Sequence, residues 1–193
     1  MKKLVALLLV SFMATSAMAV VDPDPDMIGL YFDELADQPC VEGLAPYVPT
    51  FLYVIVTNPT IDAIGGFECE ITWDGAALVT GVTFPTDFVN VGNNTNIIVG
   101  YSTPIPTTTA TIVARVDFLY TDTAGGPTGL YMGPSNPSSN EFGYPTVLDG
   151  ALNEIPWGTS TVIGEYNAMV NGNCEGVVAN EDASWGSVKS LYR

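Results

Sequence analysis

Glu68 and Glu70 are the residues whose types and spacing come nearest to catalytic chemistry. They lie in the segment GFECEITW (66–73), where a strand would hold their Cα atoms about 7 Å apart on one face. Two carboxyl groups at such a separation across a cleft can hydrolyse glycosides, provided that one has a raised pKa. On an open strand face neither pKa would shift much. A solvated face is therefore the favoured interpretation, and a carboxylate-pair hydrolase is the remote alternative.

The composition removes most other catalytic arrangements. The chain contains no His, which excludes the most common general base and every Ser-His or Cys-His pair. We therefore predict no catalytic residue, no enzymatic activity and no cofactor. Calcium is the one cation considered, because loop carboxylates suit it, although their spacing selects no site and matches no EF-hand. The acidic loop residues are Asp22, Asp24, Asp26, Asp122, Asp149 and Glu154.

Three cysteines, Cys40, Cys69 and Cys174, allow at most one internal disulfide. Cys69 falls on the apolar side of an alternating segment, and Cys40 follows a short predicted strand. The sequence favours a Cys40–Cys69 bond, with Cys40–Cys174 as the alternative. The remaining thiol is expected to be buried or to pair between molecules.

Aromatic residues could bind sugar, because exposed aromatic planes stack on pyranose rings. Trp157 lies in a predicted loop, NEIPWGTS, and is the best candidate. Tyr144 and Tyr131 are further candidates, whereas Trp73 shares the side of the core residue Phe67. Packing within the protein remains the favoured role for all of them.

The N-terminus has the three parts of a secretory signal peptide. Lys2 and Lys3 precede an apolar run (4–13), and Ala17-Met18-Ala19 is a small-x-small cleavage site. Export would place the protein outside the cell or at the cell surface, with the periplasm as an alternative. The predicted organisation is a signal peptide at 1–19, an extended acidic leader at 20–27, a β-sandwich domain at 28–172 and a C-terminal tail at 173–193.

Cleavage after Ala19 would leave 21 acidic residues and three basic ones, Arg115, Lys189 and Arg193, for a net formal charge of 3 − 21 = −18. Such a surface repels nucleic acid and anionic lipid. No segment after the signal peptide approaches the length of a membrane span. We expect no binding to nucleic acid and no membrane span in the mature chain. We expect the protein to bind a protein partner, another copy of itself or a polysaccharide.

Short segments with a two-residue period predict an all-β fold. Clusters of Gly, Pro, Asn and Asp separate them, and no helical period occurs before residue 180. In residues 66–73, Phe67, Cys69, Ile71 and Trp73 share one side of the predicted strand. In residues 110–120, the even-numbered residues share one side. The pattern is typical of an immunoglobulin-like or jelly-roll β-sandwich. Strands are expected at 28–33, 51–57, 66–73, 78–84, 96–101 and 110–120, and more weakly at 144–148, 161–163 and 168–170.

One stretch resembles a known family. GGFECEITWDGAALVTGVTFP (65–85) is similar to paired strands of cohesin-like modules and related carbohydrate-binding sandwiches, and ATIVARVDFLY (110–120) resembles a later core strand of the same fold. The residues that match are Phe67, Ile71, Asp74, Leu78 and Val82, which are packing residues. The resemblance therefore implies a fold and brings no binding residue with it. The chain also resembles small uncharacterised secreted bacterial proteins with a GLYFD-type start and a TWGxVKxLYR-type tail.

The C-terminal segment EDASWGSVKSLYR (181–193) has the pattern of a short amphipathic helix. Trp185, Val188 and Leu191 or Tyr192 fall on one stripe, and the acidic start and the basic finish, Lys189 and Arg193, suit the helix dipole. A helix of this length needs a surface to pack on. That surface is either its own sandwich or a partner.

These observations favour an exported, non-catalytic structural or adhesion-type module that acts by surface binding or assembly, with a C-terminal docking or sorting tail. A carbohydrate-binding module using exposed aromatic residues is the alternative.

Overall fold

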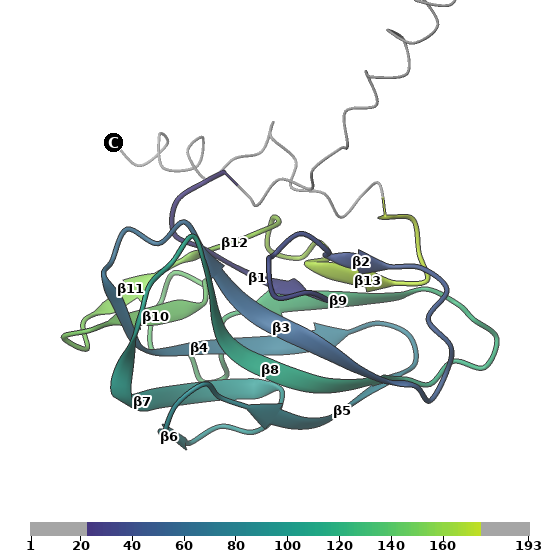
Figure 1. The fold of residues 1–193 in the computed structure, drawn as a ribbon, viewed down its shortest axis with the longest axis horizontal. Helices are drawn as coiled ribbons and strands as arrows, with labels where there is room; N and C mark the ends of the chain where they lie inside the picture. The colour runs from purple at the N-terminus through teal and green to yellow at the C-terminus, as the bar shows by residue number, and fades with distance from the viewer. Residues whose placement is uncertain (1–22, 175–193) are drawn as a thin grey trace, which may run out of the picture.

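The alternating segments form β-strands that stack in two layers. The structure, a computed structural model, describes residues 23–174. Figure 1 shows β3 and β8 of one layer crossing in front of β4 of the other. The strands are β1 (Met27–Tyr31), β2 (Cys40–Val41), β3 (Pro49–Thr57), β4 (Ala63–Trp73), β5 (Ala77–Thr83), β6 (Phe88–Asn90), β7 (Asn96–Pro106), β8 (Ala110–Tyr120), β9 (Thr128–Gly133), β10 (Thr146–Asp149), β11 (Glu154–Pro156), β12 (Gly158–Thr159) and β13 (Ala168–Val170).

Each layer is one β-sheet. The five-stranded sheet has the order β12-β1-β3-β8-β5, and the eight-stranded sheet runs β11-β10-β4-β9-β13-β2. The second sheet continues through β7 and β6, because β7 pairs with the other edge of β4. Two pairs are parallel, β1 with β12 and β2 with β13, and both join an early strand to a late one. Among the described residues, no helix has the length and apolar character that a membrane crossing requires.

The inward faces of the two sheets form one hydrophobic core. Phe67, Cys69 and Ile71 of β4 point inward, as their alternation predicts, and all three are buried. Facing them, the five-stranded sheet contributes Leu52 of β3 and Phe118 of β8 to the same cluster. Full burial of one such large apolar side chain contributes about 1.5–3 kcal/mol to folding. The prediction of an all-β sandwich is therefore confirmed, whereas the predicted C-terminal helix lies outside the described residues.

Two β-bulges change which residues face inward. In β8 the register with β3 shifts next to Val54, so Val113 and Ala114 are both buried. Ile112 then packs with Ile55 in a small outer cluster, although the sequence predicted it for the core. In β5 the shift between Val79 and Gly81 has the same effect. The prediction that Leu78 faces inward is wrong, because one extra residue reverses the side to which every residue beyond it points.

Most of the predicted strands are present. The exception is 161–163, which forms a turn in which the Glu165 N–H donates to the Val162 carbonyl at 2.9 Å. Short strands were missed because two or three residues carry no readable period, and β9 was missed because Gly129 and Gly133 read as loop residues. The unpredicted strands are β2, β6, β9, β11 and β12.

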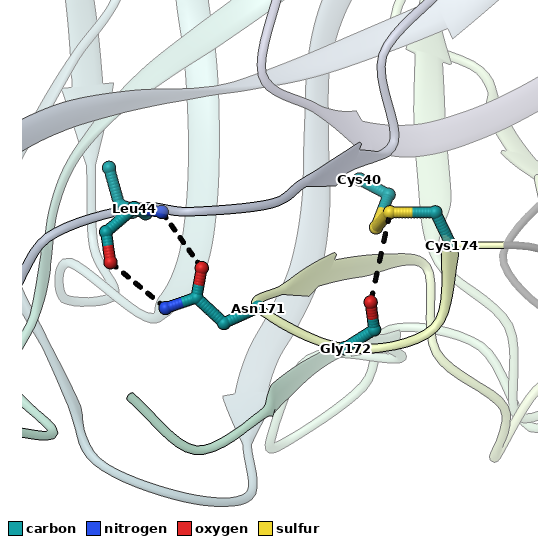
Figure 2. Close-up of a disulfide and its surroundings, with 5 residues drawn as sticks. All are labelled: Cys40, Leu44, Asn171, Gly172 and Cys174. Atoms are coloured by element: carbon teal, nitrogen blue, oxygen red, sulfur yellow. Dashed lines mark hydrogen bonds between the residues drawn. A yellow bond between two sulfur atoms is a disulfide. The ribbon is translucent and has the colours of Figure 1, made fainter. Parts of the chain in front are cut away.

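One disulfide joins β2, near the start of the described chain, to its last residue (Figure 2). Cys40 on β2 bonds to Cys174, which follows β13, with their Cα atoms 5.5 Å apart. The preference for Cys40–Cys69 was wrong, since Cys69 is fully buried on the inner face of β4 and has a free thiol. Burial raises the pKa of the Cys69 thiol, so it stays protonated and unreactive at neutral pH. Position on an inner strand face thus protects this cysteine from pairing.

Removing the disulfide by Cys40→Ala with Cys174→Ala should lower the free energy of unfolding by about 3–5 kcal/mol, because the bond closes a long loop. Guanidinium unfolding measures this change. Cys69→Ala is the matched control, which retains the bond. In native wild-type protein no thiol should react with a thiol reagent, and one should react after unfolding. Peptide mapping that links Cys69 to another cysteine would contradict the assignment.

Candidate functional site

The predicted site residues fall into two groups. The tail residues Trp185, Val188, Lys189, Leu191, Tyr192 and Arg193 lie outside the described residues, so their predicted docking role stays a prediction. The aromatic, acidic and cysteine candidates lie inside them, apart from Asp22. The structure assigns each of these a position.

Trp157 is a core residue. Its side chain is 1% exposed and belongs to the main hydrophobic cluster, and its backbone N–H donates to the Pro145 carbonyl at 2.9 Å. This burial agrees with the packing role that the sequence favours, and it removes Trp157 as the exposed ring of the carbohydrate-binding alternative. A loop in sequence does not imply exposure here, because the turn between β11 and β12 folds its one large side chain between the sheets. Tyr144, in the loop before β10, is half-buried.

Tyr131 belongs to a cluster that sequence reasoning did not find. Its ring lies 4.9 Å from the ring of Tyr166, and both hydroxyls donate to Asp74 Oδ2 at 3.1 Å. Asp74 Oδ1 accepts the Gly129 N–H at 2.7 Å. Hydrogen bonding to Tyr166 is the largest cause that raises the pKa of Tyr131, followed by desolvation and by Asp74. The carboxylate thus fixes both rings and joins β4 to β9, which explains the Asp at this turn structurally.

Glu68 anchors a loop. It is 7% exposed, and its Oε1 accepts the Ser139 N–H at 2.8 Å and the Ser139 hydroxyl at 2.7 Å. The expectation of a solvated pair is wrong for Glu68, because residues 134–145 fold back over this part of β4. A second anchor joins Asn136 to Asn96, with hydrogen bonds of 2.8 and 2.7 Å. Glu68 therefore organises the loop rather than facing an open cleft.

Three of the acidic loop residues considered for calcium accept hydrogen bonds from loop groups of the chain. Asp26 accepts the Thr60 N–H at 2.7 Å, and Asp122 accepts the N–H groups of Ala124 and Gly126. Hydrogen bonds from Asn153, the largest cause, lower the pKa of Asp149. Within residues 23–174, no group of three or more acidic, Cys or His side chains is placed to hold a metal ion.

The outward face of β6 and β7 carries the most exposed large apolar side chains of the described chain. Val91 is 74% exposed and Val89 is 69% exposed. Val89 lies opposite Gly100 of β7, and Gly100 lies opposite Gly66 of β4. A side chain at Gly100 would meet no atom within 4 Å, so this part of the face is flat and open. We call the surface formed by Val89, Val91, Ile98, Gly100 and Leu148 the β6–β7 face.

Two features make the β6–β7 face a candidate docking surface. It is flat and backbone-rich at its centre, and its exposed valines have two methyl groups each and little rotamer freedom to lose on binding. Leu148 Cδ1 lies 3.2 Å from where a side chain at Gly66 would start, so Leu148 covers that glycine and extends the apolar row. Contiguous exposed apolar residues on a protein of this size mark sites of protein contact. Sequence reasoning missed this face because β6 is too short to predict.

Solved structures with a similar fold include cohesins. A type II cohesin domain from the cellulosome of Acetivibrio cellulolyticus matches with a TM-score of 0.52 and 14% identity, over 81% of this chain and 100% of that one. The sixth cohesin of scaffoldin B from the same organism, solved in complex with a Cel5 dockerin, matches with a TM-score of 0.50 and 14% identity, over 75% of this chain and 96% of that one. The fold is cohesin-like. No protein-family model matches the chain, and no curated protein matches it either.

The cohesin-like fold agrees with the resemblance drawn from residues 65–85, of which Phe67 and Ile71 are core residues in the structure. Leu78 matches the pattern in sequence, yet it is 53% exposed. At 14% identity the likeness concerns the path of the chain and the packing of the sheets. It assigns no binding residue.

Trp157→Ala should lower the free energy of unfolding by about 3–5 kcal/mol, because it empties a large buried volume. Chemical unfolding measures the change. Phe142→Ala, at a side chain that is 64% exposed, is the matched control and should change stability by about 0.5 kcal/mol or less. Unchanged stability in Trp157→Ala would contradict the core role.

Glu68→Ala should release the loop at 134–145, since it leaves the Ser139 N–H without its acceptor, at a cost of about 1–3 kcal/mol. Hydrogen exchange of the loop peptide measures the release. Glu68→Gln keeps one acceptor oxygen and should cost less, and Glu70→Gln should leave the loop protected. A loop that exchanges equally slowly in Glu68→Ala and in the wild type would refute the anchor.

Proposed function

We propose that this chain is an exported, non-catalytic assembly or adhesion module that binds a protein partner through the β6–β7 face. The exposure of Val89 and Val91 beside the open Gly100 is the observation that carries the proposal. Apolar side chains at this exposure remain in contact with water unless a partner covers them. The described residues carry seventeen acidic side chains and one basic one, so apolar contact rather than opposite charge distinguishes this face from most of the surface.

The cohesin-like fold supports a protein rather than a small molecule as the partner. One cohesin with this fold was solved in complex with a dockerin, which is a protein module. The partner of this chain would present an apolar surface bordered by basic residues. Within residues 23–174 there are seventeen acidic residues and one basic residue, Arg115. Such a charge steers cationic partners toward the module and sets the rate of association more than its strength.

A non-catalytic role fits the chemistry of the residues present. Glu68, one member of the carboxylate pair, is engaged by Ser139, and no His exists to serve as a general base. Export and a location outside the cell rest on the signal-peptide pattern of residues 1–19, and the single disulfide is consistent with an oxidising compartment. The tail from Glu181 to Arg193 would serve docking or sorting.

The residue that the sequence favours most for sugar binding is buried. Trp157 is buried, and the hydroxyls of Tyr131 and Tyr166 are already bound to Asp74. The two rings are tilted by 43° rather than lying in one plane. Trp157 and Tyr131, two of the sugar-binding candidates named from the sequence, therefore offer no flat exposed platform, which favours a protein over a polysaccharide as the partner.

Val89→Asp with Val91→Asp should abolish partner binding, because each Asp places a charge where the partner's apolar surface must dehydrate it. The test captures proteins from the secreted fraction of the native organism on immobilised wild-type protein, then measures the affinity of the purified partner for each variant.

Leu78→Asp, at an exposed leucine of the other sheet, is the matched control and should keep wild-type affinity. A partner that binds the double variant as tightly as the wild type would exclude the β6–β7 face. Retention of no protein by the wild type would exclude the proposed function.

A further inference from the structure

A second apolar surface lies on the outward face of the five-stranded sheet. Leu78 of β5, Leu119 of β8 and Pro49 of β3 lie side by side in register. Phe51 continues the row along β3, and Tyr47 precedes it, with its N–H bound to the Tyr120 carbonyl at 2.8 Å. We call this surface the β3–β8 stripe. Its residues are Tyr47, Pro49, Phe51, Leu78 and Leu119.

The β3–β8 stripe is exposed although it is rich in large apolar groups. Tyr47 is 61% exposed, Leu78 is 53% exposed and Phe51 is 45% exposed. The stripe ends at a polar border, where Arg115 lies 4.4 Å from the centre of the Phe51 ring and 3.6 Å from Asp117. An apolar row with a charged border is the form of a surface that receives an amphipathic segment.

The described chain ends within reach of this stripe. Cys174 is tied to Cys40, and three residues before it Asn171 makes two hydrogen bonds with the backbone of Leu44, at 2.8 and 2.9 Å (Figure 2). Tyr47 follows Leu44 by three residues, a distance of roughly 10 Å along the chain at most. The disulfide and the Asn171 hydrogen bonds therefore hold Cys174, the last described residue, at the β2–β13 edge of the other sheet, from which the nineteen residues that follow are long enough to reach the stripe.

The segment that begins there has the complementary chemistry. Residues 175–193 number nineteen, enough to span on the order of 60 Å when extended. Trp185, Val188 and Leu191 are spaced to lie on one face of a helix. Lys189 and Arg193 offset Glu181 and Asp182, so residues 181–193 carry no net formal charge, and both positive charges lie in the last five residues. The body of the chain, with seventeen acidic side chains and one Arg, attracts that basic end, and the apolar stripe of the segment supplies the rest of the contact.

We propose that residues 181–193 dock in cis on the β3–β8 stripe, with Trp185 and Leu191 covering Phe51 and Leu78. A short tether gives the segment an effective concentration on the order of a millimolar. A weak intrinsic affinity is then sufficient for the stripe to be covered most of the time. The docked segment shields the stripe from unwanted association and leaves the β6–β7 face, on the other sheet, as the surface open to partners. The inference is independent of the proposed function, because it concerns a different sheet and needs no partner.

Acrylamide quenching of Trp185 fluorescence in the purified protein tests the proposal. Acrylamide is neutral, so the acidic surface does not repel it. Subtracting the signal of Trp185→Phe removes the contribution of Trp73 and Trp157. The expected result is that Trp185 is quenched several-fold less than in a free peptide of residues 181–193, independently of protein concentration. Phe51→Thr with Leu78→Thr should restore quenching to the level of the peptide.

The controls keep the proposal falsifiable. Thr preserves the strand preference of both sites, and an unchanged unfolding midpoint confirms that the double variant folds. Val89→Thr with Val91→Thr is the matched control on the other sheet and should leave Trp185 shielded. Quenching of wild-type Trp185 like that of the peptide would overturn the proposal. So would shielding that survives Phe51→Thr with Leu78→Thr, or shielding that rises with protein concentration, which would indicate a second copy as the occupant.

Discussion

The contact between the inward faces of the two sheets is the constraint on which the rest of the structure depends. Phe67 and Ile71 of β4 must meet the inward residues of β3 and β8 at the density of a protein interior. A strand slipped by one residue would expose its entire apolar row. The bulges in β5 and β8 adjust the strands locally, so that the core stays filled along their length. The outward faces take no part in this packing, so the residues exposed on them differ between the two sheets.

Much of the fold could be predicted because the residues of a strand that face the core recur at every second position in the sequence. It held for β4, where Phe67, Cys69 and Ile71 are all buried, and for β8 from Ala114 onward. It failed at Leu78 and Ile112, because a bulge leaves no mark in the local pattern. Glu68 was misplaced for a related reason. It is buried by residues 134–145, which are distant in sequence, and no local pattern reports what folds over a residue.

The candidate site was harder to predict than the fold. The β6–β7 face depends on residues of β6, β7 and β10, and Gly100 matters because it lies between Val89 of β6 and Gly66 of β4. The disulfide partner was equally a matter of topology. The parallel pairing of β13 with β2 brings Cys174 to Cys40, whereas Cys69 is enclosed by the core. In both cases the decisive information is the order of strands in the sheet, which short segments of sequence do not contain.

The proposed function depends on a protein partner that covers the β6–β7 face. Methyl-resolved NMR of the purified protein, titrated with the captured partner, tests whether it does. The methyl signals of Val89, Val91, Ile98 and Leu148 should shift or broaden on binding, while those of Leu78 and Leu119 stay in place. Unchanged Val89 and Val91 signals at saturation would contradict it.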